Sequence, residues 1–302
     1  MYLSGFADEA ARDLAGQIRA TRELGWECIE ARSVNDVNLV DLDEAAFART
    51  LDSLGEAGIR INCFGSTIAN WGKPPTGDFS AELASVDRAI DRMRRSGTEL
   101  IRIMSYAILE DGDGRPLPDQ MEKERFRRLN EICRRFTGAG LTPVHENCHS
   151  YGGMSWSHTL RMLDNVAGMK LVFDTGNPVG LADYSREFPY PRQSAWEFYQ
   201  KVQKHIVYVH IKDANWDEAQ KEVVYCYPGE GEAEIKRIAG DLLSHGYDGG
   251  FSMEPHMVVV FHDAKAADRE REEERFANYV AYGRKFMALL SDLGRPLAKG
   301  AS

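Results

Sequence analysis

Residues 142–147, Thr-Pro-Val-His-Glu-Asn, form the stretch of this chain that most directly indicates its fold. The stretch begins as a short apolar strand and ends on an imidazole, a carboxylate and a carboxamide. Three later stretches repeat the pattern, each an apolar run that closes on one side chain able to bind a metal. They are 171–174 (Leu-Val-Phe-Asp), 206–210 (Ile-Val-Tyr-Val-His) and 250–254 (Gly-Phe-Ser-Met-Glu). Four strands that end alike predict one shared site.

A repeated unit surrounds these stretches. Amphipathic segments with apolar residues three and four apart end at glycine, and an apolar run follows within a few residues. Glycine suits the left-handed position that ends a helix, and short loops connect a helix to the next strand. The predicted strands are 3–6, 28–30, 60–64, 100–104, 142–146, 171–174, 207–210 and 251–254. Eight strand-helix units in 302 residues predict a single (β/α)8 TIM barrel domain over 1–302, with a doubly wound open sheet as the alternative.

Composition excludes several classes of protein. The net charge of −10 disfavours a nucleic-acid surface, which needs a basic stripe. No apolar run reaches the roughly 20 residues that span a membrane, and residues 1–9 lack the basic and apolar regions of a secretory signal. Five scattered cysteines without CxxC pairs are typical of a reduced protein. We therefore expect a cytoplasmic protein that binds neither nucleic acid nor membrane.

The ends of strands five to eight each carry one potential ligand, and adjacent barrel strands lie about 4.8 Å apart. The four side chains can therefore converge on one cation. Three carboxylates and one imidazole suit Mn²⁺ first, with Mg²⁺, Co²⁺, Fe²⁺ and Zn²⁺ as alternatives. A structural ion pair would explain any one of them, but not four at equivalent positions of a barrel. The predicted ligands are Glu146, Asp174, His210 and Glu254.

At these positions the chain resembles the xylose isomerase-like barrel superfamily, which holds sugar isomerases, ketose epimerases, inosose dehydratases and apurinic endonucleases. The resemblance covers nearly the whole chain, and its motifs are specific only together. They are Ala7-Asp8-Glu9, Glu30-Ala31-Arg32, His145-Glu146-Asn147, Asp174-Thr175-Gly176-Asn177, His210-Ile211-Lys212-Asp213 and Glu254-Pro255-His256. The resemblance implies one divalent cation on the four predicted ligands and proton transfer next to a sugar carbonyl.

Departures from the family pattern bear on the reaction. Ketose epimerases usually carry His where this chain has Asn177, and Arg where Trp216 stands. The segment from His210 to Asp213 is more similar to the inosose dehydratases, which eliminate water beside a ketone. Through its His-Glu-Asn motif the chain also resembles the large subunits of C-glycoside deglycosidases, which cleave 3-keto-C-glycosides by β-elimination beside a small partner subunit. The resemblance favours a lyase, with a keto-sugar isomerase or epimerase and a non-catalytic sugar-binding barrel as alternatives.

Proton transfer needs a base and an acid, and several strand-end residues could serve. His145 has an imidazole suited to a base, although alternation with Glu146 turns it toward the helices. Lys212 shares the face of His210 and could donate a proton, or else pair with a carboxylate. The ligand carboxylates of Glu146 and Glu254 are further candidates for the base. The predicted substrate contacts are Glu30, Arg32, Asn147, Asn177, Trp216 and His256.

Two aromatic-rich insertions, 178–194 and 215–232, follow strands that carry ligands. In a barrel both lie on the face that holds the active site, where their rings wall a sugar pocket or pack on one another. Residues from about 263 to 291 predict a C-terminal helical extension, charged at first and then apolar. These features predict an oligomer, with a small second subunit as one alternative for the partner. The expected small-molecule partner is a sugar or a keto-glycoside.

Overall fold

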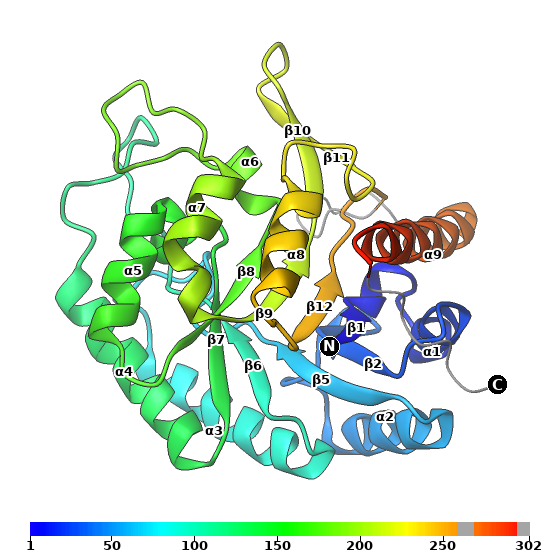
Figure 1. Cartoon of the computed structure of the whole chain (residues 1–302). Helices are drawn as coiled ribbons and strands as arrows, with labels where there is room; N and C mark the ends of the chain where they lie inside the picture. The colour runs from blue at the N-terminus through cyan, green and yellow to red at the C-terminus, as the bar shows by residue number, and fades with distance from the viewer. Residues whose placement is uncertain (259–268, 295–302) are drawn as a thin grey trace.

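Eight parallel strands form one sheet that curves into a barrel (Figure 1). The computed structural model of the chain describes residues 1–258 and 269–294. The barrel strands are β1 (Tyr2–Gly5), β2 (Cys28–Ala31), β5 (Arg60–Gly65), β6 (Leu100–Ile103), β7 (Thr142–Glu146), β8 (Lys170–Asp174), β9 (Ile206–Ile211) and β12 (Gly250–Met253). Their order in the sheet is β1, β12, β9, β8, β7, β6, β5 and β2, and a bridge between Phe6 and Glu30 joins its two ends. The predicted (β/α)8 barrel is confirmed.

A ring of helices surrounds the strands (Figure 1). The helices are α1 (Leu14–Glu23), α2 (Glu44–Ala57), α3 (Phe79–Ser96), α4 (Glu122–Gly138), α5 (Trp156–Asn165), α7 (Ala195–Val202), α8 (Ile235–Ser244) and α9 (Arg269–Asp292). Polar side chains cap several of their beginnings, as when Asp43 accepts a hydrogen bond from the Ala46 amide. Left-handed Gly58, with φ of 69°, ends α2 as expected.

The last helix, α9, packs beside α1 and α8 and so covers the remaining side of the barrel (Figure 1). The predicted extension from about 263 to 291 coincides with α9 where the chain is described, whereas 263–268 lie outside the described residues. Among the helices that the structure describes, none has the length and apolar character needed to cross a membrane.

Short elements decorate the barrel. After the ends of the strands lie the turns η1 (Ala7–Glu9) and η2 (Tyr151–Met154), the one-turn helix α6 (Asn177–Gly180), and the hairpins β3 (Ser33–Val34) with β4 (Val37–Asn38) and β10 (Asp213–Asp217) with β11 (Glu222–Cys226). A third turn, η3 (Gln203–His205), precedes β9. The β10–β11 hairpin begins two residues before the second predicted insertion and forms much of it. The carboxyl ends of the strands therefore carry most of the irregular structure, as in other barrels with a site on that face.

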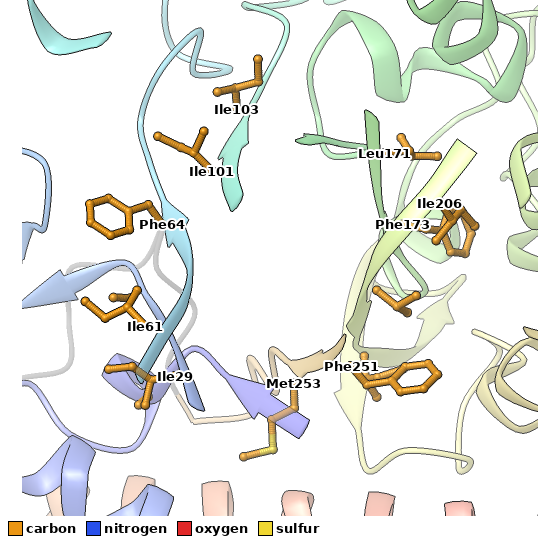
Figure 2. Close-up of a cluster of buried hydrophobic side chains, with 14 of the residues drawn as sticks. Ile29, Ile61, Phe64, Ile101, Ile103, Leu171, Phe173, Ile206, Phe251 and Met253 are labelled. Carbon is orange, nitrogen blue, oxygen red and sulfur yellow. The ribbon is translucent and has the colours of Figure 1, made fainter. Parts of the chain in front are cut away.

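Alternation along the strands separates two apolar layers. Outward side chains such as Ile101, Leu171 and Phe173 pack beneath the helices, on the outer side of the strands (Figure 2). A smaller cluster of Cys63, Val144, Val172 and Tyr208 lies apart from this layer. Truncating a fully buried phenylalanine to alanine costs about 3–5 kcal/mol in a well-packed core. The outer layer therefore fixes the strands, and the inward positions near their ends are left for polar residues.

A chain of hydrogen bonds runs through polar residues of the barrel strands. Ser4 Oγ donates to Asn62 Oδ1 over 2.5 Å, and Asn62 Nδ2 donates to the Tyr208 hydroxyl over 2.7 Å. The Tyr208 hydroxyl in turn donates to Glu30 Oε2 over 2.9 Å. Buried polar groups are stable only when they are hydrogen-bonded. These hydrogen bonds thus fix the position of the Glu30 carboxylate.

Candidate metal and substrate site

The four residues predicted to bind a cation meet at the carboxyl end of the barrel. Glu146 and Asp174 close β7 and β8, His210 lies on β9, and Glu254 follows β12. Each offers one ligand atom, and these atoms all lie within 4.8 Å of one another. All four side chains are buried. Because consecutive positions of a strand face opposite sides, the shared inward direction follows from the strand register.

His210 is held by a second carboxylate. Its Nε2 lies 3.0 Å from Glu30 Oε2, so this nitrogen carries a proton that it donates to Glu30. Its Nδ1 is buried without a hydrogen-bond partner and lies 3.9 Å from Glu146 Oε1 and 4.0 Å from Asp174 Oδ2. Metal-binding histidines commonly show one nitrogen on a carboxylate and the other turned to the cation. The arrangement fits a metal ligand.

The charges around this point are not balanced by protein alone. Among the described residues, six connected carboxylates face three permanent cations, an excess of three negative charges that falls to two when His210 is protonated. The carboxylates are Asp8, Glu9, Glu30, Glu146, Asp174 and Glu254, and the cations are Arg32, Arg102 and Lys212. Buried charge is costly unless it is paired. Three carboxylates and an imidazole form the oxygen-rich donor set that a hard divalent cation prefers, so the residues fit such an ion.

The three cations each contact a predicted ligand. Arg102 donates to Glu146 Oε2 over 2.8 Å, and Arg32 donates to Glu254 Oε1 over 2.8 Å. Lys212 Nζ lies 2.6 Å from Glu254 Oε2 and 3.0 Å from Asp174 Oδ2. Sequence reasoning missed Arg102, although the signal was present. A polar residue between Ile101 and Ile103 in a buried strand must face the barrel interior.

The pKa values reflect this crowding. Burial raises the pKa of Asp174 to about 6, against the opposing Lys212 ammonium. For Glu146, the Arg102 guanidinium outweighs burial and holds the pKa below its usual range. Burial opposes a charge on His210, but Glu30 and Glu146 outweigh it and raise its pKa to about 10. Burial also opposes the charge on Lys212, but Asp174 and Glu254 keep its pKa well above the usual value, so this side chain stays an ammonium.

A cavity of about 950 Å³ opens onto this cluster. Glu146 and Glu254 line it, whereas Asp174 and His210 are not among its lining residues. Four residues predicted from sequence as substrate contacts or acid line it as well: Arg32, Asn177, Lys212 and His256. Asn177 Nδ2 also donates to Glu146 Oε1 over 3.0 Å. The cavity wall therefore holds two of the four candidate cation ligands together with several hydrogen-bonding groups.

His145 does not reach this cavity, which corrects the expectation that it could act as the base. It is in register with Ile103 and Leu171, whose side chains lie outside the barrel (Figure 2). Its Nε2 lies 3.0 Å from Ser105 Oγ, and its ring packs so closely on Gly152 that a Cβ there would meet it at 2.4 Å. Strand alternation therefore places this imidazole on the outer side of the barrel, although an imidazole is chemically suited to act as a base.

Three of the predicted substrate contacts are also placed elsewhere. Asn147 joins β7 to β8, because its Nδ2 donates to the Asp174 carbonyl and its Oδ1 accepts from the Asp174 amide. Glu30 is occupied by His210 and Tyr208. Trp216 lies on the β10 strand of the hairpin under Arg192, whose guanidinium is 3.5 Å from the ring centroid. None of the three lines the cavity among the described residues.

Of the aromatic residues in the two insertions, some line the cavity and others pack elsewhere. Phe188 and Tyr184 of the first insertion pack against Tyr190, so these rings contact one another. From the second insertion Tyr225 lines the cavity, whereas Tyr227 packs toward Tyr282 and Lys285. The rings of the first insertion therefore pack on one another, and the second insertion contributes one ring to the cavity wall. Trp71, which follows β5, adds a ring to the cavity that the sequence did not single out.

Solved structures share this architecture at low sequence identity. A xylose isomerase-like TIM barrel protein from Mycobacterium smegmatis, solved in complex with magnesium, superposes with a TM-score of 0.63 at 18% identity over 93% of this chain and 97% of that one. The probable 3-DHS dehydratase AsbF from Bacillus anthracis gives 0.65 at 15%, over 95% and 98%. A D-tagatose 3-epimerase-like protein gives 0.68 at 14%, over 97% and 98%. At these identities the likeness shows the fold.

Comparison of the sequence with family models identifies the family as well as the fold. No curated protein matches the chain individually. The family described as xylose isomerase-like TIM barrel matches residues 18–277, which include all four predicted ligands. The chain therefore belongs to the xylose isomerase-like TIM barrel family.

Proposed function

We propose that this chain is a divalent-metal-dependent enzyme that removes the proton α to the carbonyl of a keto-sugar. One observation carries the proposal: the buried set of Glu146, Asp174, His210 and Glu254 meets beside a cavity, with His210 Nδ1 unpartnered. The magnesium of the M. smegmatis relative supports a divalent cation. Mn²⁺ is our first candidate for the ion, since it accepts both carboxylate and imidazole ligands.

The chain supplies groups for binding a sugar and moving its protons. A divalent cation on the four ligands supplies Lewis-acid polarisation of a carbonyl, which lowers the cost of an enolate. Lys212 is held as an ammonium between Asp174 and Glu254 and can donate a proton at the cavity wall. Arg32 and Asn177 provide donors for carbonyl or hydroxyl oxygens. Enolisation of a bound ketone requires an acid and a base, and Lys212 can serve as the acid.

Among reactions that begin this way we favour β-elimination from a keto-inositol or a 3-keto-glycoside. An elimination needs an acid near the leaving group, and Lys212 is placed as one. The cavity of about 950 Å³ is at the upper end of the roughly 300–1,000 Å³ range for drug-sized ligands, which supports a substrate larger than a bare ketose. Trp71 and Tyr225, rather than Trp216, would contact a flat leaving group. The dehydratase among the relatives supports the same reaction class.

Isomerisation or epimerisation of a keto-sugar is the second candidate, and the epimerase-like relative supports it. Incubation with D-fructose, 2-keto-myo-inositol and a 3-keto-glucoside in deuterated water separates the two. Released aglycone or water-elimination product, seen by NMR, supports the lyase. Deuterium uptake with interconverted sugars and no release contradicts the lyase and leaves the isomerase. Neither result, in protein with bound cation, favours a sugar-binding barrel without turnover.

We also propose that the protein is an oligomer, in which a small second subunit is one possible partner. Exposed large apolar side chains come from five different loops that follow barrel strands: Val37, Trp71, Leu117, Phe188 and Val224. Exposed apolar groups gathered on one face are typical of interaction sites. Size-exclusion chromatography with light scattering tests the homo-oligomer, and a fully active monomer contradicts it. The cytoplasmic location stays a prediction from the sequence.

A further inference from the structure

Glu9 and His256 form a bonded pair at the edge of the cavity. Glu9 Oε2 accepts from the His256 backbone amide over 2.8 Å, and Glu9 Oε1 lies 2.9 Å from His256 Nδ1. A carboxylate accepts but does not donate, so Nδ1 carries the proton and Nε2 carries the lone pair. His256 has φ of 53°, a left-handed conformation that is uncommon for a residue with a side chain. The two bonds to Glu9 hold it there.

The His256 imidazole belongs to the wall of the cavity, and its Nε2 makes no hydrogen bond with the described residues. His256 lines the cavity, and its Nε2 lies 3.7 Å from Glu254 Oε1, which is longer than a hydrogen bond. That Glu254 oxygen already accepts from Arg32 over 2.8 Å. The ring of Tyr225 stands edge-on to the imidazole, with centroids 5.2 Å apart. Nε2 is therefore an oriented acceptor next to a proposed cation ligand, on a residue of the cavity wall.

The two ligand carboxylates that line the cavity already accept hydrogen bonds. Glu146 accepts from Arg102 and Asn177, and Glu254 accepts from Lys212 and Arg32. Lys212 Nζ lies 2.6 Å from Glu254 Oε2 and 3.0 Å from Asp174 Oδ2, so it directs donors at carboxylates and does not serve as an acceptor. His145 lies outside the barrel interior, as described above. His149 also lines the cavity, but it is exposed and no described contact orients it.

We propose that His256 is the base that removes the α-proton of the substrate, and that Glu9 is the positioning residue that fixes its tautomer and direction. This assignment rests on the proposed function. The C–H bond next to the carbonyl breaks, its electron pair forms the carbon–carbon double bond of the enolate, and the proton forms an N–H bond at Nε2. The resulting imidazolium is paired with the Glu9 carboxylate. In an elimination, the enolate then expels the β-substituent, which takes a proton from Lys212.

The test measures deuterium exchange at the α-carbon by NMR for the full-length protein with bound Mn²⁺, using D-fructose, 2-keto-myo-inositol and a 3-keto-glucoside as probes. A positioned base contributes about 10²–10⁴-fold, so His256→Gln should lower kcat for exchange at least 100-fold with KM changed little. Glu9→Gln should lower kcat by a smaller factor. Added imidazole should restore exchange to His256→Ala, which a structural role would not predict. Bound manganese and unfolding midpoint are recorded for each variant, and His245→Gln on the exposed end of α8 is the matched control.

The outcomes separate the two proposals. Exchange retained by His256→Gln, or lost only through a raised KM, overturns the base assignment and leaves the proposed function standing. Loss of exchange in His149→Gln with retention in His256→Gln also overturns it, in favour of the exposed histidine. Absence of exchange in the wild-type protein with all three probes overturns the proposed function and this assignment together.

Discussion

His210 and Glu30 are joined by a hydrogen bond of 3.0 Å between Nε2 and Oε2, and this bond determines which imidazole nitrogen faces Glu146 and Asp174. Glu30 lies on β2 and His210 on β9, so the bond crosses the barrel interior. The Tyr208 hydroxyl holds the same carboxylate. Orientation of the proposed imidazole ligand therefore depends on a residue that would not touch the cation.

Replacing Glu30 by glutamine should weaken Mn²⁺ binding about 10–100-fold, because partners of metal-binding histidines typically contribute that much. The amide keeps the shape of the side chain but loses the charge that steadies the imidazole. Equilibrium dialysis with metal analysis measures the dissociation constant. Glu56→Gln, an exposed change on α2, is the control and should leave it unaltered. An unchanged constant in Glu30→Gln contradicts the ligand role of His210.

Removing a ligand should abolish the stoichiometric ion. Glu146→Gln and Asp174→Asn each take one charged oxygen from the set, and elemental analysis should find less than one ion per chain in both. In the wild type, Mn²⁺ at 100 times its dissociation constant should add about 2.7 kcal/mol to the free energy of unfolding. Chelation should reverse that gain. Full retention of one ion per chain in both variants would remove the basis of the proposed function.

Arg102→Met should destabilise the chelator-treated protein by about 3–5 kcal/mol, because it leaves Glu146 as a buried carboxylate without its cation. Urea unfolding measures the loss, and added Mn²⁺ should recover part of it by supplying positive charge to the same carboxylate. Arg127→Met breaks an exposed pair with Glu124 and should cost at most about 1 kcal/mol. Equal losses in the free energy of unfolding of the two variants would show that the buried ion pair contributes no more to stability than the exposed one.

His145→Gln should lower the free energy of unfolding by about 1–3 kcal/mol, since it disturbs the buried contact with Ser105. Its exchange rate per folded molecule should equal that of the wild type, because the side chain does not line the cavity. Deuterium uptake normalised to folded protein provides the measurement. A selective fall in kcat with stability intact would return His145 to the reaction.

Much of the fold could be predicted because each barrel strand carries its own pattern. The β7 strand Thr142–Glu146 was predicted with its observed bounds, and the convergence of the four strand-end side chains follows from register and alternation. Arg102 was equally predictable, since Ile101 and Ile103 on either side assign it to the interior. These inferences use only local order along one strand.

What could not be predicted depends on contacts between distant loops. The position of Trp216 follows from the hairpin that pairs β10 with β11 and from Arg192, which is supplied by another loop. The bonds from Glu9 to His256 link the first and last barrel segments, and no spacing in the sequence indicates them. Family resemblance singled out both motifs but not their pairing.

The neighbouring positions of β1 and β12 also bear on the order in which the chain acquires its properties. Their pairing, and the contact of Glu9 with His256 across 247 positions of sequence, require nearly the whole polypeptide. Contacts so distant form late, because ordering the long intervening segment costs entropy first. A nascent chain that has not yet released its last strand from the ribosome lacks Glu254 and His256. Closure of the barrel and assembly of the proposed cation ligands and base are then a single event, so we expect incomplete chains to lack the proposed activity.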